Sequence, residues 1–259
     1  MGILDGRVAC VTGGTRGVGR AAAEAYLAEG ASVVVNGRDS DKGATAVSEM
    51  GGGDNIHFIA ADMMQRDDCE ALIQGTVDHY GKLDILHANA GGAVGPGPVV
   101  DMTDEGMQDT MVWNFWHTFW TMRAALKHMI PQESGRIIAT SSVEGKLGSA
   151  GLSNYSASKH AIHGLITSAS KEVGTLGITI NAVCPGAMET DSMRDAAPAA
   201  AEAMGMTYEA LKDMFAQASA IKRLNNVEEV AAVCLLLASD AGAGITGGFL
   251  SVDGGTSPF

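Results

Sequence analysis

The sequence lacks any apolar run approaching the roughly 20 residues that a membrane-spanning helix needs. Its N-terminal residues also lack the apolar core of a secretory signal peptide. Basic residues are scarce, because 17 Lys and Arg face 30 Asp and Glu and leave a net charge of −13. Such a chain repels nucleic-acid phosphates and anionic lipid headgroups. We therefore expect a cytoplasmic protein with no nucleic-acid partner and no membrane partner.

Cysteine is rare as well, and neither cysteine nor histidine forms a metal-binding motif. The four cysteines lie far apart with no CxxC pair, which argues against a disulfide framework and indicates reduced core residues. The seven histidines include no HExxH motif. The closest pair, His160 and His163, is typical of helix surface or packing positions. We expect no metal ion.

Apolar residues and glycine are plentiful. Apolar types make up 46% of the 259 residues, and the 34 glycines are about 13% of the chain against an ordinary share of about 7%. No Pro/Ser-rich linker or repeat divides the chain. Short β-branched runs alternate with helical stretches, at residues 8–12, 32–36, 56–60, 85–88, 136–141, 179–183 and 249–252. This alternation predicts a single-domain α/β fold over residues 1–259, a Rossmann-type doubly wound, seven-stranded parallel sheet flanked by helices.

Residues 187–222 form the one irregular stretch, rich in Ala and Met with mixed charges. They follow the sixth predicted strand, and ligands of open α/β sheets sit beyond the carboxyl ends of the strands. We interpret this stretch as a helical substrate lid. A helical pair that only fills surface space is the alternative.

A glycine-rich loop, Thr12-Gly13-Gly14-Thr15-Arg16-Gly17-Val18-Gly19, follows the first predicted strand and opens a helix that runs to about Glu29. Glycines permit close backbone approach, and a helix N-terminus offers free N–H groups and a positive dipole end to a pyrophosphate. A plain tight turn would also be rich in glycine, but the place between strand and helix favours dinucleotide binding. The candidate contacts are Gly13, Thr15, Arg16, Gly17, Val18 and Gly19.

Further motifs follow in order: Asn89-Ala90-Gly91 after the fourth strand, Tyr155-Ser156-Ala157-Ser158-Lys159 on a helix, Pro185-Gly186 after the sixth strand, and the closing Val252-Asp253-Gly254-Gly255. With the GxxxGxG spacing of the first loop, they make the whole chain resemble the short-chain dehydrogenase/reductase family in its form of about this length. The resemblance implies a nicotinamide nucleotide as cofactor.

Several cofactor contacts are implied by the same resemblance. Asp62 would receive the adenine, Asn89, Ala90 and Gly91 would support the sheet beside the adenine ribose, and the backbone around Met188 with Thr190 would hold the nicotinamide carboxamide. Met63, Pro185 and Gly186 complete the implied set. Taken alone, Asp62 would be a turn residue or helix cap, and Thr190 a capping hydroxyl.

The choice of nucleotide depends on charge near the end of the second strand. A carboxylate there binds the ribose hydroxyls of NAD(H), whereas the 2′-phosphate of NADP(H) needs an arginine. Gly37 occupies the expected acidic position, Arg38 follows it, and Arg16 lies inside the glycine loop. NADP(H) is therefore favoured. NAD(H) stays possible, because a shift of one residue would bring Asp39 to the ribose.

Hydride transfer to a ketone leaves negative charge on its oxygen, which a proton donor must neutralise. Tyr155 can donate that proton if its pKa, ordinarily about 10, falls toward neutrality. Lys159 lies one helical turn further on, so its ammonium on the same face favours the tyrosinate. A Tyr and a Lys four residues apart usually form a surface pair, but the order of the motifs favours catalysis.

Two more catalytic residues are implied by the resemblance. Ser142, at the end of the fifth strand, matches the family's substrate-orienting serine, and a hydroxyl there would stabilise charge on the carbonyl oxygen. Ser141 is the alternative if the register differs by one residue. Asn114, in the helix after the fourth strand, matches the residue that holds a water against the lysine.

Two helices show faces that predict assembly. Trp113, Trp116 and Trp120 fall within about 60° of one another at 100° per residue, with Phe115 and Phe119 roughly opposite. A helix that is apolar on two faces must bury both. The helix carrying Tyr155 has small residues on its opposite side, namely Ala157, Ala161, Gly164 and Ser168. We predict a homo-oligomer, most simply a homotetramer; the alternative is that one aromatic face lines the substrate pocket.

The expected function is that of an NADP(H)-dependent carbonyl reductase or secondary-alcohol dehydrogenase acting on a small-molecule ketone or alcohol. An NAD-dependent alcohol dehydrogenase and a 3-oxoacyl thioester reductase are alternative enzymes. The chain's acidity disfavours an acidic protein carrier, because like charges slow encounter. A redox-sensing dinucleotide-binding module is the non-enzyme alternative, since a fold does not fix a function.

Overall fold

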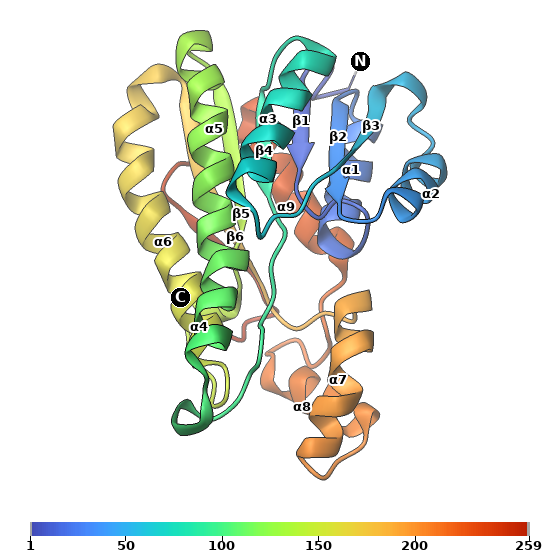
Figure 1. The fold of residues 1–259 in the computed structure, drawn as a ribbon, viewed down its shortest axis with the longest axis vertical. Coiled ribbons are helices and arrows are strands. Elements are labelled where there is room, and N and C mark those ends of the chain that lie inside the picture. The colour runs from blue at the N-terminus through green and yellow to red at the C-terminus, as the bar shows by residue number, and fades with distance from the viewer. Residues whose placement is uncertain (1, 258–259) are drawn as a thin grey trace.

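Seven parallel strands form one sheet in the order β3-β2-β1-β4-β5-β6-β7 (Figure 1). The computed structural model describes residues 2–257, without the side chains of Ser192, Ala196, Ala199, Ala200 and Ala203. The strands are β1 (Val8–Val11), β2 (Ser32–Gly37), β3 (Ile56–Ala60), β4 (Ile85–Ala88), β5 (Gly135–Thr140), β6 (Ile178–Pro185) and β7 (Phe249–Val252). The predicted fold class is confirmed, and the predicted strand ends differ from these by no more than two residues.

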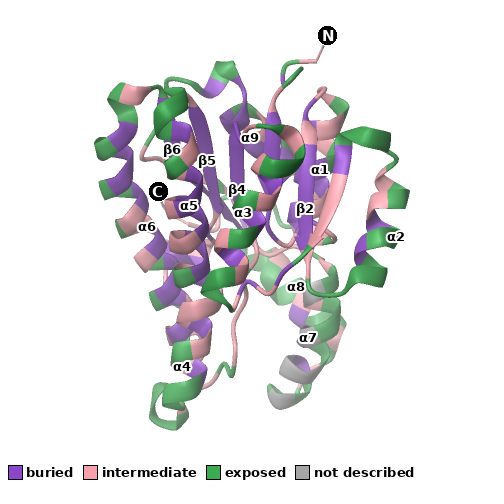
Figure 2. Ribbon diagram, turned by 45° about the horizontal axis from the view of Figure 1, so that its top comes forward, coloured by how far each residue is buried: buried purple, intermediate pink, exposed green. Residues whose placement is uncertain are grey.

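Helices cover both faces of the sheet. One layer holds α1 (Gly17–Ala28), α2 (Ser40–Met50) and α9 (Val227–Ala238), and α1 packs on α9. The other holds α3 (Arg66–Tyr80), α5 (His117–Gln132) and α6 (Ser153–Val173), and α5 packs on both of its neighbours. The central strands are buried on both sides, as Figure 2 shows by their purple colour, and most of their residues are apolar. His87 in β4 and Thr179 and Asn181 in β6 are buried polar exceptions.

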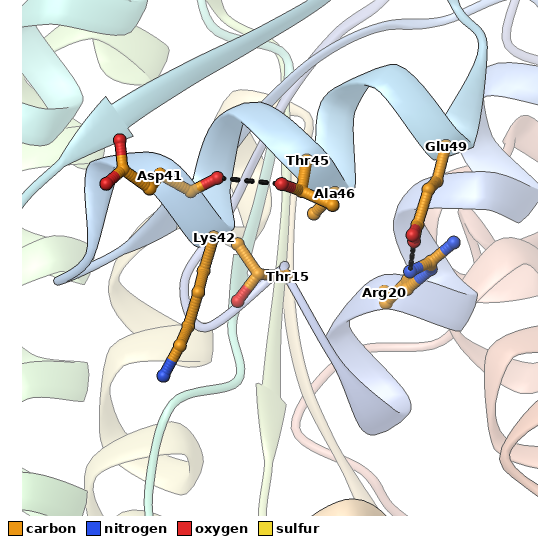
Figure 3. Close-up of a pocket in the computed structure, with 7 residues that line it drawn as sticks. All are labelled: Thr15, Arg20, Asp41, Lys42, Thr45, Ala46 and Glu49. Carbon is orange, nitrogen blue, oxygen red and sulfur yellow. Dashed lines mark hydrogen bonds and ion pairs between the residues drawn. The ribbon is translucent and has the colours of Figure 1, made fainter.

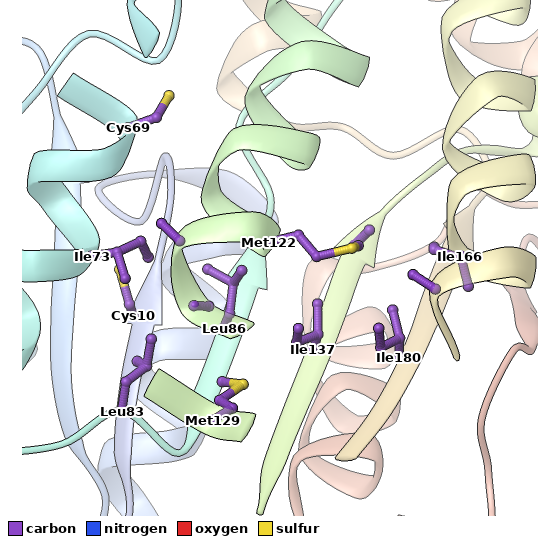
Figure 4. Close-up of a cluster of buried hydrophobic side chains, with 14 of the residues drawn as sticks. Cys10, Cys69, Ile73, Leu83, Leu86, Met122, Met129, Ile137, Ile166 and Ile180 are labelled. Atoms are coloured by element: carbon purple, nitrogen blue, oxygen red, sulfur yellow. The ribbon is translucent and has the colours of Figure 1, made fainter. Parts of the chain in front are cut away.

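The larger core cluster fills the space between the sheet and the second layer of helices (Figure 4). Leu86, Ile137 and Ile180 contribute from three adjacent strands, and Met122 and Ile166 contribute from α5 and α6. The four cysteines, Cys10, Cys69, Cys184 and Cys234, are buried free thiols, as expected. This packing fixes α5 and α6, and α6 carries Tyr155 and Lys159, two of the four predicted catalytic side chains.

The helix before α5 contains an irregularity that the sequence did not reveal. α4 (Asp104–Met111) continues through a π-helical segment, Val112–Trp116, into α5. A π turn holds more residues than an α turn and often marks a functional site. The segment therefore breaks the 100° spacing that was assumed for the aromatic residues.

The expected division of the aromatic residues into a tryptophan face and a phenylalanine face is consequently wrong. Trp116 stacks on Trp120 with ring centres 5.9 Å apart, but Phe119 also contacts Trp116 edge-on at 5.9 Å. Phe115 and Trp120 pack against the same core cluster. Trp113 lies apart from the other two tryptophans and packs against the Gly92 backbone.

Residues 187–222 form two helices beyond the carboxyl ends of the strands, α7 (Asp191–Ala203) and α8 (Tyr208–Ala218), at the bottom of Figure 1. They pack on each other through a small apolar cluster of their own around Ala201 and Leu211. An ion pair of 3.0 Å joins Asp195 of α7 to Arg16 of the glycine loop. In the part of the chain that is described, no helix has the length and apolarity to cross a membrane.

Candidate active site

The predicted site residues gather at the carboxyl edge of the sheet, along the ends of β1 to β6. This edge includes the switch point, where β1 lies between β2 and β4 and the strand order reverses. Open α/β sheets bind ligands at such a point. The glycine loop leaves β1, the Asn89-Ala90-Gly91 segment leaves β4, and Ser142 follows β5.

The glycine loop is shaped to bring backbone N–H groups to a ligand. Gly17 adopts a φ of 56°, which favours glycine, and a Cβ atom at Gly19 would lie 2.5 Å from the Asn89 amide nitrogen. Arg16 occupies the N-cap of α1, and its side chain makes no capping hydrogen bond. The first N–H groups of α1 therefore have no side-chain acceptor at this position, as a pyrophosphate site requires. The residues present fit a dinucleotide.

Two asparagines fix this loop, the buried Asn36 and the half-buried Asn89, and Asn36 was not predicted from the sequence. The Asn36 Oδ1 accepts from Gly13 N at 3.0 Å, and its Nδ2 donates to Ala61 O at 2.8 Å. Asn89 donates from Nδ2 to Thr12 O at 3.0 Å. Three strand ends are thus joined to the loop by side-chain amides. Asn36 could have been found from the sequence, because it is a short polar residue that follows three valines near the end of β2.

The surface beside the loop is rich in cations. Arg38 is exposed after β2, and a hollow between the loop and α2 is lined by Thr15 and Lys42, where Lys42 extends from α2 past Thr15 (Figure 3). Asp39 caps α2, because its carboxylate accepts from Asp41 N at 3.0 Å and Lys42 N at 3.1 Å. Lys42, which the sequence analysis did not include, joins Arg38 as a candidate phosphate ligand.

Asp62 and Met63 occupy the loop after β3. The Asp62 Oδ1 accepts from Met64 N at 3.0 Å, which is the turn role that its residue type alone suggested. Met63 is buried in the core cluster with its sulfur 3.8 Å from Cys69 Sγ. The Met63 side chain is therefore part of the core, and only its backbone faces the loop as a possible ligand contact.

The loop after β6 lies on the other side of the glycine loop. Pro185 ends β6, and Gly186 packs so closely on Asp253 that a Cβ atom would lie 2.8 Å from the Asp253 Cα. Met188 forms a β-bridge with Asn225. The Thr190 Oγ1 accepts from Met193 N at 3.3 Å and so caps α7, and its side chain faces Gly17.

Tyr155 and Lys159 share the inner face of α6. The Lys159 ammonium is buried, donates to Thr140 O at 2.8 Å, and lies over the Tyr155 ring, 5.4 Å from the ring centre. Loss of hydration lowers the pKa of Lys159 to about 7. Because a cation here would be poorly hydrated, the Lys159 proton is labile near neutrality.

The expected lowering of the Tyr155 pKa is wrong for this structure. Removal from water raises the pKa of Tyr155 to about 12, the Ser142 hydroxyl opposes the rise through a hydrogen bond, and the Glu144 carboxylate adds to it. The Lys159 ammonium lies 5.4 Å from the ring centre and does not offset the effect of burial on this pKa. Tyr155 is therefore a protonated phenol at neutral pH.

Ser141 and Ser142 point in different directions, which bears on the alternative that the sequence left open. Ser141 is buried with its hydroxyl 2.8 Å from His163 Nε2. Ser142 is half-buried, accepts from Glu144 N at 3.2 Å, and contacts Tyr155. The geometry favours Ser142 as the residue beside the phenol. His163 contacts Ser141 on the side away from the phenol, and the sequence did not predict that contact.

Asn114 lies in the π-helical segment and is fully buried. Its Nδ2 donates to Gly92 O and Thr110 O, both at 2.8 Å, and its Oδ1 accepts from Gly92 N at 3.1 Å. Gly91 separates it from Lys159, since a Cβ atom on Gly91 would lie 2.5 Å from Asn114 Oδ1 and 3.4 Å from Lys159 Nζ. The Asn114 side chain thus holds the loop after β4 against the lysine.

Glu144 is buried and fully hydrogen-bonded. Its carboxylate accepts from the Ser149 hydroxyl at 2.5 Å, from Ser149 N at 3.1 Å and from the Ser156 hydroxyl at 2.6 Å. Ser156 follows Tyr155 on α6. Glu144 therefore fastens the loop that carries Ser142 to the helical turn that carries Tyr155.

Comparisons with known proteins agree with this arrangement. A family model described as short chain dehydrogenase matches residues 7–201. The chain is 38% identical to a putative ketoacyl reductase of the monensin polyketide synthase from Streptomyces virginiae, over 98% of both chains. It is 36% identical to the 3-oxoacyl-acyl-carrier-protein reductase of Vibrio cholerae, over 97% of this chain and 98% of that one. Actinorhodin polyketide ketoreductase, solved as a variant with NADPH, superposes with a TM-score of 0.94 and 31% identity over the full length of both chains.

The shifted pKa of Lys159 predicts a pH-dependent stability. The folded chain has a Lys159 pKa of about 7, below the unfolded value of about 10.4. The unfolded chain therefore binds more protons between these values, and the free energy of unfolding rises with pH there. Urea titrations from pH 7 to 8.5 should show wild type gaining stability relative to Lys159→Met. Lys171→Met, at an exposed position of the same helix, is the control and should show no such trend; a flat difference for Lys159→Met would refute the assignment.

Proposed function

The chain belongs to the short-chain dehydrogenase family, and from this premise we propose that it is an NADP(H)-dependent ketoreductase that interconverts a ketone and a secondary alcohol. The meeting of Ser142, Tyr155 and Lys159 at the carboxyl end of β5 carries the proposal. It gives one place where a carbonyl oxygen can meet a hydroxyl donor and a phenol together. A purely sensing role would not require that constellation.

The residues of the chain supply the proton and the orientation. Tyr155 donates its phenolic proton to the carbonyl oxygen, and Ser142 hydrogen-bonds the same oxygen as negative charge develops on it. Lys159, held by the Thr140 carbonyl, can return a proton toward Tyr155 because burial makes that proton labile. When bound, a reduced nicotinamide supplies the hydride. Asn114 and Gly91 keep the loop after β4 in place beside the lysine.

NADP(H) is the proposed nucleotide because Arg38 and Lys42 lie near the end of β2 and the Asp39 carboxylate is engaged, both as the cap of α2 and in an ion pair of 3.7 Å with Lys42. Asp39 caps α2, which supports its exclusion from a ribose-binding role. Arg38 and Lys42 lie on the exposed rim of the loop. The structural neighbour solved with NADPH supports the same choice. The nucleotide contacts proposed in the glycine loop and the loops after β3, β4 and β6 remain as the sequence predicted them, with Met63 limited to its backbone.

The proposed substrate is a 3-oxoacyl compound or a related ketone. Two relatives carry names of ketoacyl or 3-oxoacyl reductases. In this proposal the chain is one catalytic domain, and α7 and α8, which lie beyond the strand ends, serve as its substrate lid. The net charge of −13 favours a free or CoA-linked substrate over one held by an acidic protein.

The proposed place of action is a reducing cytoplasm, which the four buried free thiols support.

We further propose that the chain forms a homotetramer through α5 and α6. A groove between these helices is lined by Phe119, Leu126 and Leu165, and Gly164 beside it leaves open space around its backbone. Gly164→Arg should place a charged side chain on this face. Sedimentation at micromolar concentration should then show smaller species than wild type, whereas a wild type that sediments as a monomer would refute the assembly.

Tyr155→Phe tests the chemistry. The variant keeps the ring but removes the proton donor, so we expect a loss of about 100-fold or more in kcat with nearly unchanged NADPH binding. Reduction of acetoacetyl-CoA and of simple ketones is followed by NADPH absorbance, and NADPH binding by fluorescence. Tyr80→Phe, which removes a hydroxyl bonded to Asp54 O on the far edge of the sheet, is the matched control and should stay active. Substantial ketone reduction by Tyr155→Phe would remove the acid role.

Arg38→Ala tests the nucleotide. Loss of one charge-assisted contact to the 2′-phosphate should raise the KM for NADPH by about 10- to 100-fold and leave the KM for NADH unchanged. Arg66→Ala, at an exposed arginine of α3, is the control. Equal effects on NADPH and NADH, or none, would contradict the assignment of Arg38.

A further inference from the structure

Two fully buried histidines approach the Asn89-Ala90-Gly91 segment from opposite faces of the sheet. His87 lies in β4 and faces the α1 layer, where it contacts Tyr26 and Cys234. His117 opens α5 in the other layer. Neither has a role in the proposed chemistry. Each nevertheless ends a chain of hydrogen bonds that leads to Asn89.

The hydrogen bonds around Thr12 determine the tautomer of His117. The Thr12 Oγ1 accepts from Asn89 N at 2.8 Å and from Ala90 N at 3.0 Å, which uses both of its lone pairs. Its own hydrogen must therefore go to His117 Nε2, 3.0 Å away. His117 Nδ1 then carries the ring hydrogen and donates it to Trp113 O at 3.1 Å. His117 is neutral with the hydrogen on Nδ1.

The hydrogen bonds around Thr140 give His87 the opposite tautomer. The Asn89 amide is oriented by its donations to two loop carbonyls, Thr12 O and Gly13 O, so its Oδ1 accepts from the Thr140 hydroxyl at 3.1 Å. Thr140 has given its hydrogen, so His87 Nε2 must donate to it at 2.9 Å. His87 Nδ1 is then the acceptor that faces the Tyr26 hydroxyl at 3.4 Å.

We propose that His87 and His117 are positioning residues, which through opposite neutral tautomers hold the Thr140 carbonyl and the Asn89-Ala90-Gly91 segment in the one placement that fits Lys159. The Thr140 carbonyl is the acceptor of the Lys159 ammonium. Gly91 lies beside the same ammonium, because a Cβ atom added there would be 3.4 Å from Lys159 Nζ. His87 thus bonds the hydroxyl of the residue whose carbonyl holds Lys159, and His117 bonds Thr12, which holds the backbone of Asn89 and Ala90 next to Gly91. The inference rests on the proposed reductase activity.

Leucine and glutamine variants separate hydrogen bonding from packing. His87→Leu and His117→Leu keep bulk but remove the bond to Thr140 or Thr12, and a displacement of Lys159 should lower kcat by about tenfold or more, with a smaller change in the KM for NADPH. His87→Gln and His117→Gln can each present the donor or acceptor that the threonine needs, and should retain most of the wild-type kcat. Equal losses in the leucine and glutamine variants would overturn the proposal.

Nitrogen NMR of the histidine-labelled wild type provides a second measurement that does not require a variant to be active. The ¹⁵N shifts should identify His117 with its hydrogen on Nδ1 and His87 with its hydrogen on Nε2, with assignments made by loss of each signal in its glutamine variant. The same tautomer at both positions would overturn the proposal. A wild type that reduces no ketone would instead refute the proposed function and leave the tautomer result readable.

Discussion

The burial of one ammonium group is the constraint on which the rest of this site depends. An ammonium has three donors, and Lys159 gives one of them to Thr140 O, while the Tyr155 ring covers another side. These contacts give the ammonium fewer hydrogen-bond acceptors than water would, and for that reason the Lys159 pKa falls to about 7. A group that brought acceptors to Nζ would raise that pKa again. The proton on Lys159 is thus held loosely by the chain and is sensitive to what binds beside it.

The same low hydration acts on Tyr155 in the opposite sense. A phenol becomes negative on losing its proton, so burial raises its pKa, and the nearby Glu144 carboxylate raises it further. Glu144 is kept in place by three hydrogen bonds, two of them from Ser149. The pair is consequently arranged with a protonated phenol beside a lysine that gives up its proton near neutrality. Tyr155 therefore carries the proton that a general acid must give, and its raised pKa makes it a weaker acid than an ordinary tyrosine.

Most of this architecture could be predicted from the sequence, because strands, turns and helix faces are determined largely by residues that are close together along the chain. The apolar β-branched runs predicted the strands, and the glycine loop and the four-residue spacing of Tyr155 and Lys159 predicted the two ends of the site. Ser142 could not be separated from Ser141 by sequence alone. Neighbouring residues at a strand end point to different sides, and only the position of His163 shows which side is which.

The features that the sequence did not predict are non-local. The π-helical segment around Asn114 has no residue signature and redirects the aromatic side chains after it. The partners of His87 and His117 lie between 53 and 147 residues away along the chain, apart from the Trp113 carbonyl one turn before His117. The pKa of Tyr155 was predicted in the wrong direction because spacing on a helix shows which residues share a face. It does not show whether the ammonium meets the ring or the hydroxyl.

Arg16 joins the two halves of the site and sets a competition between them. Its guanidinium pairs with Asp195 of α7 at 3.0 Å, yet its place in the glycine loop also suits a nucleotide phosphate. An exposed ion pair of this kind contributes at most about 1 kcal/mol, whereas a phosphate carries more charge and several acceptors. A bound phosphate would therefore take Arg16 and release Asp195. α7 would keep the cap from Thr190 and its apolar packing on α8, and Glu189 would still pair with Lys212 of α8. A nucleotide phosphate at this position would thus compete with Asp195 of α7 for the same guanidinium.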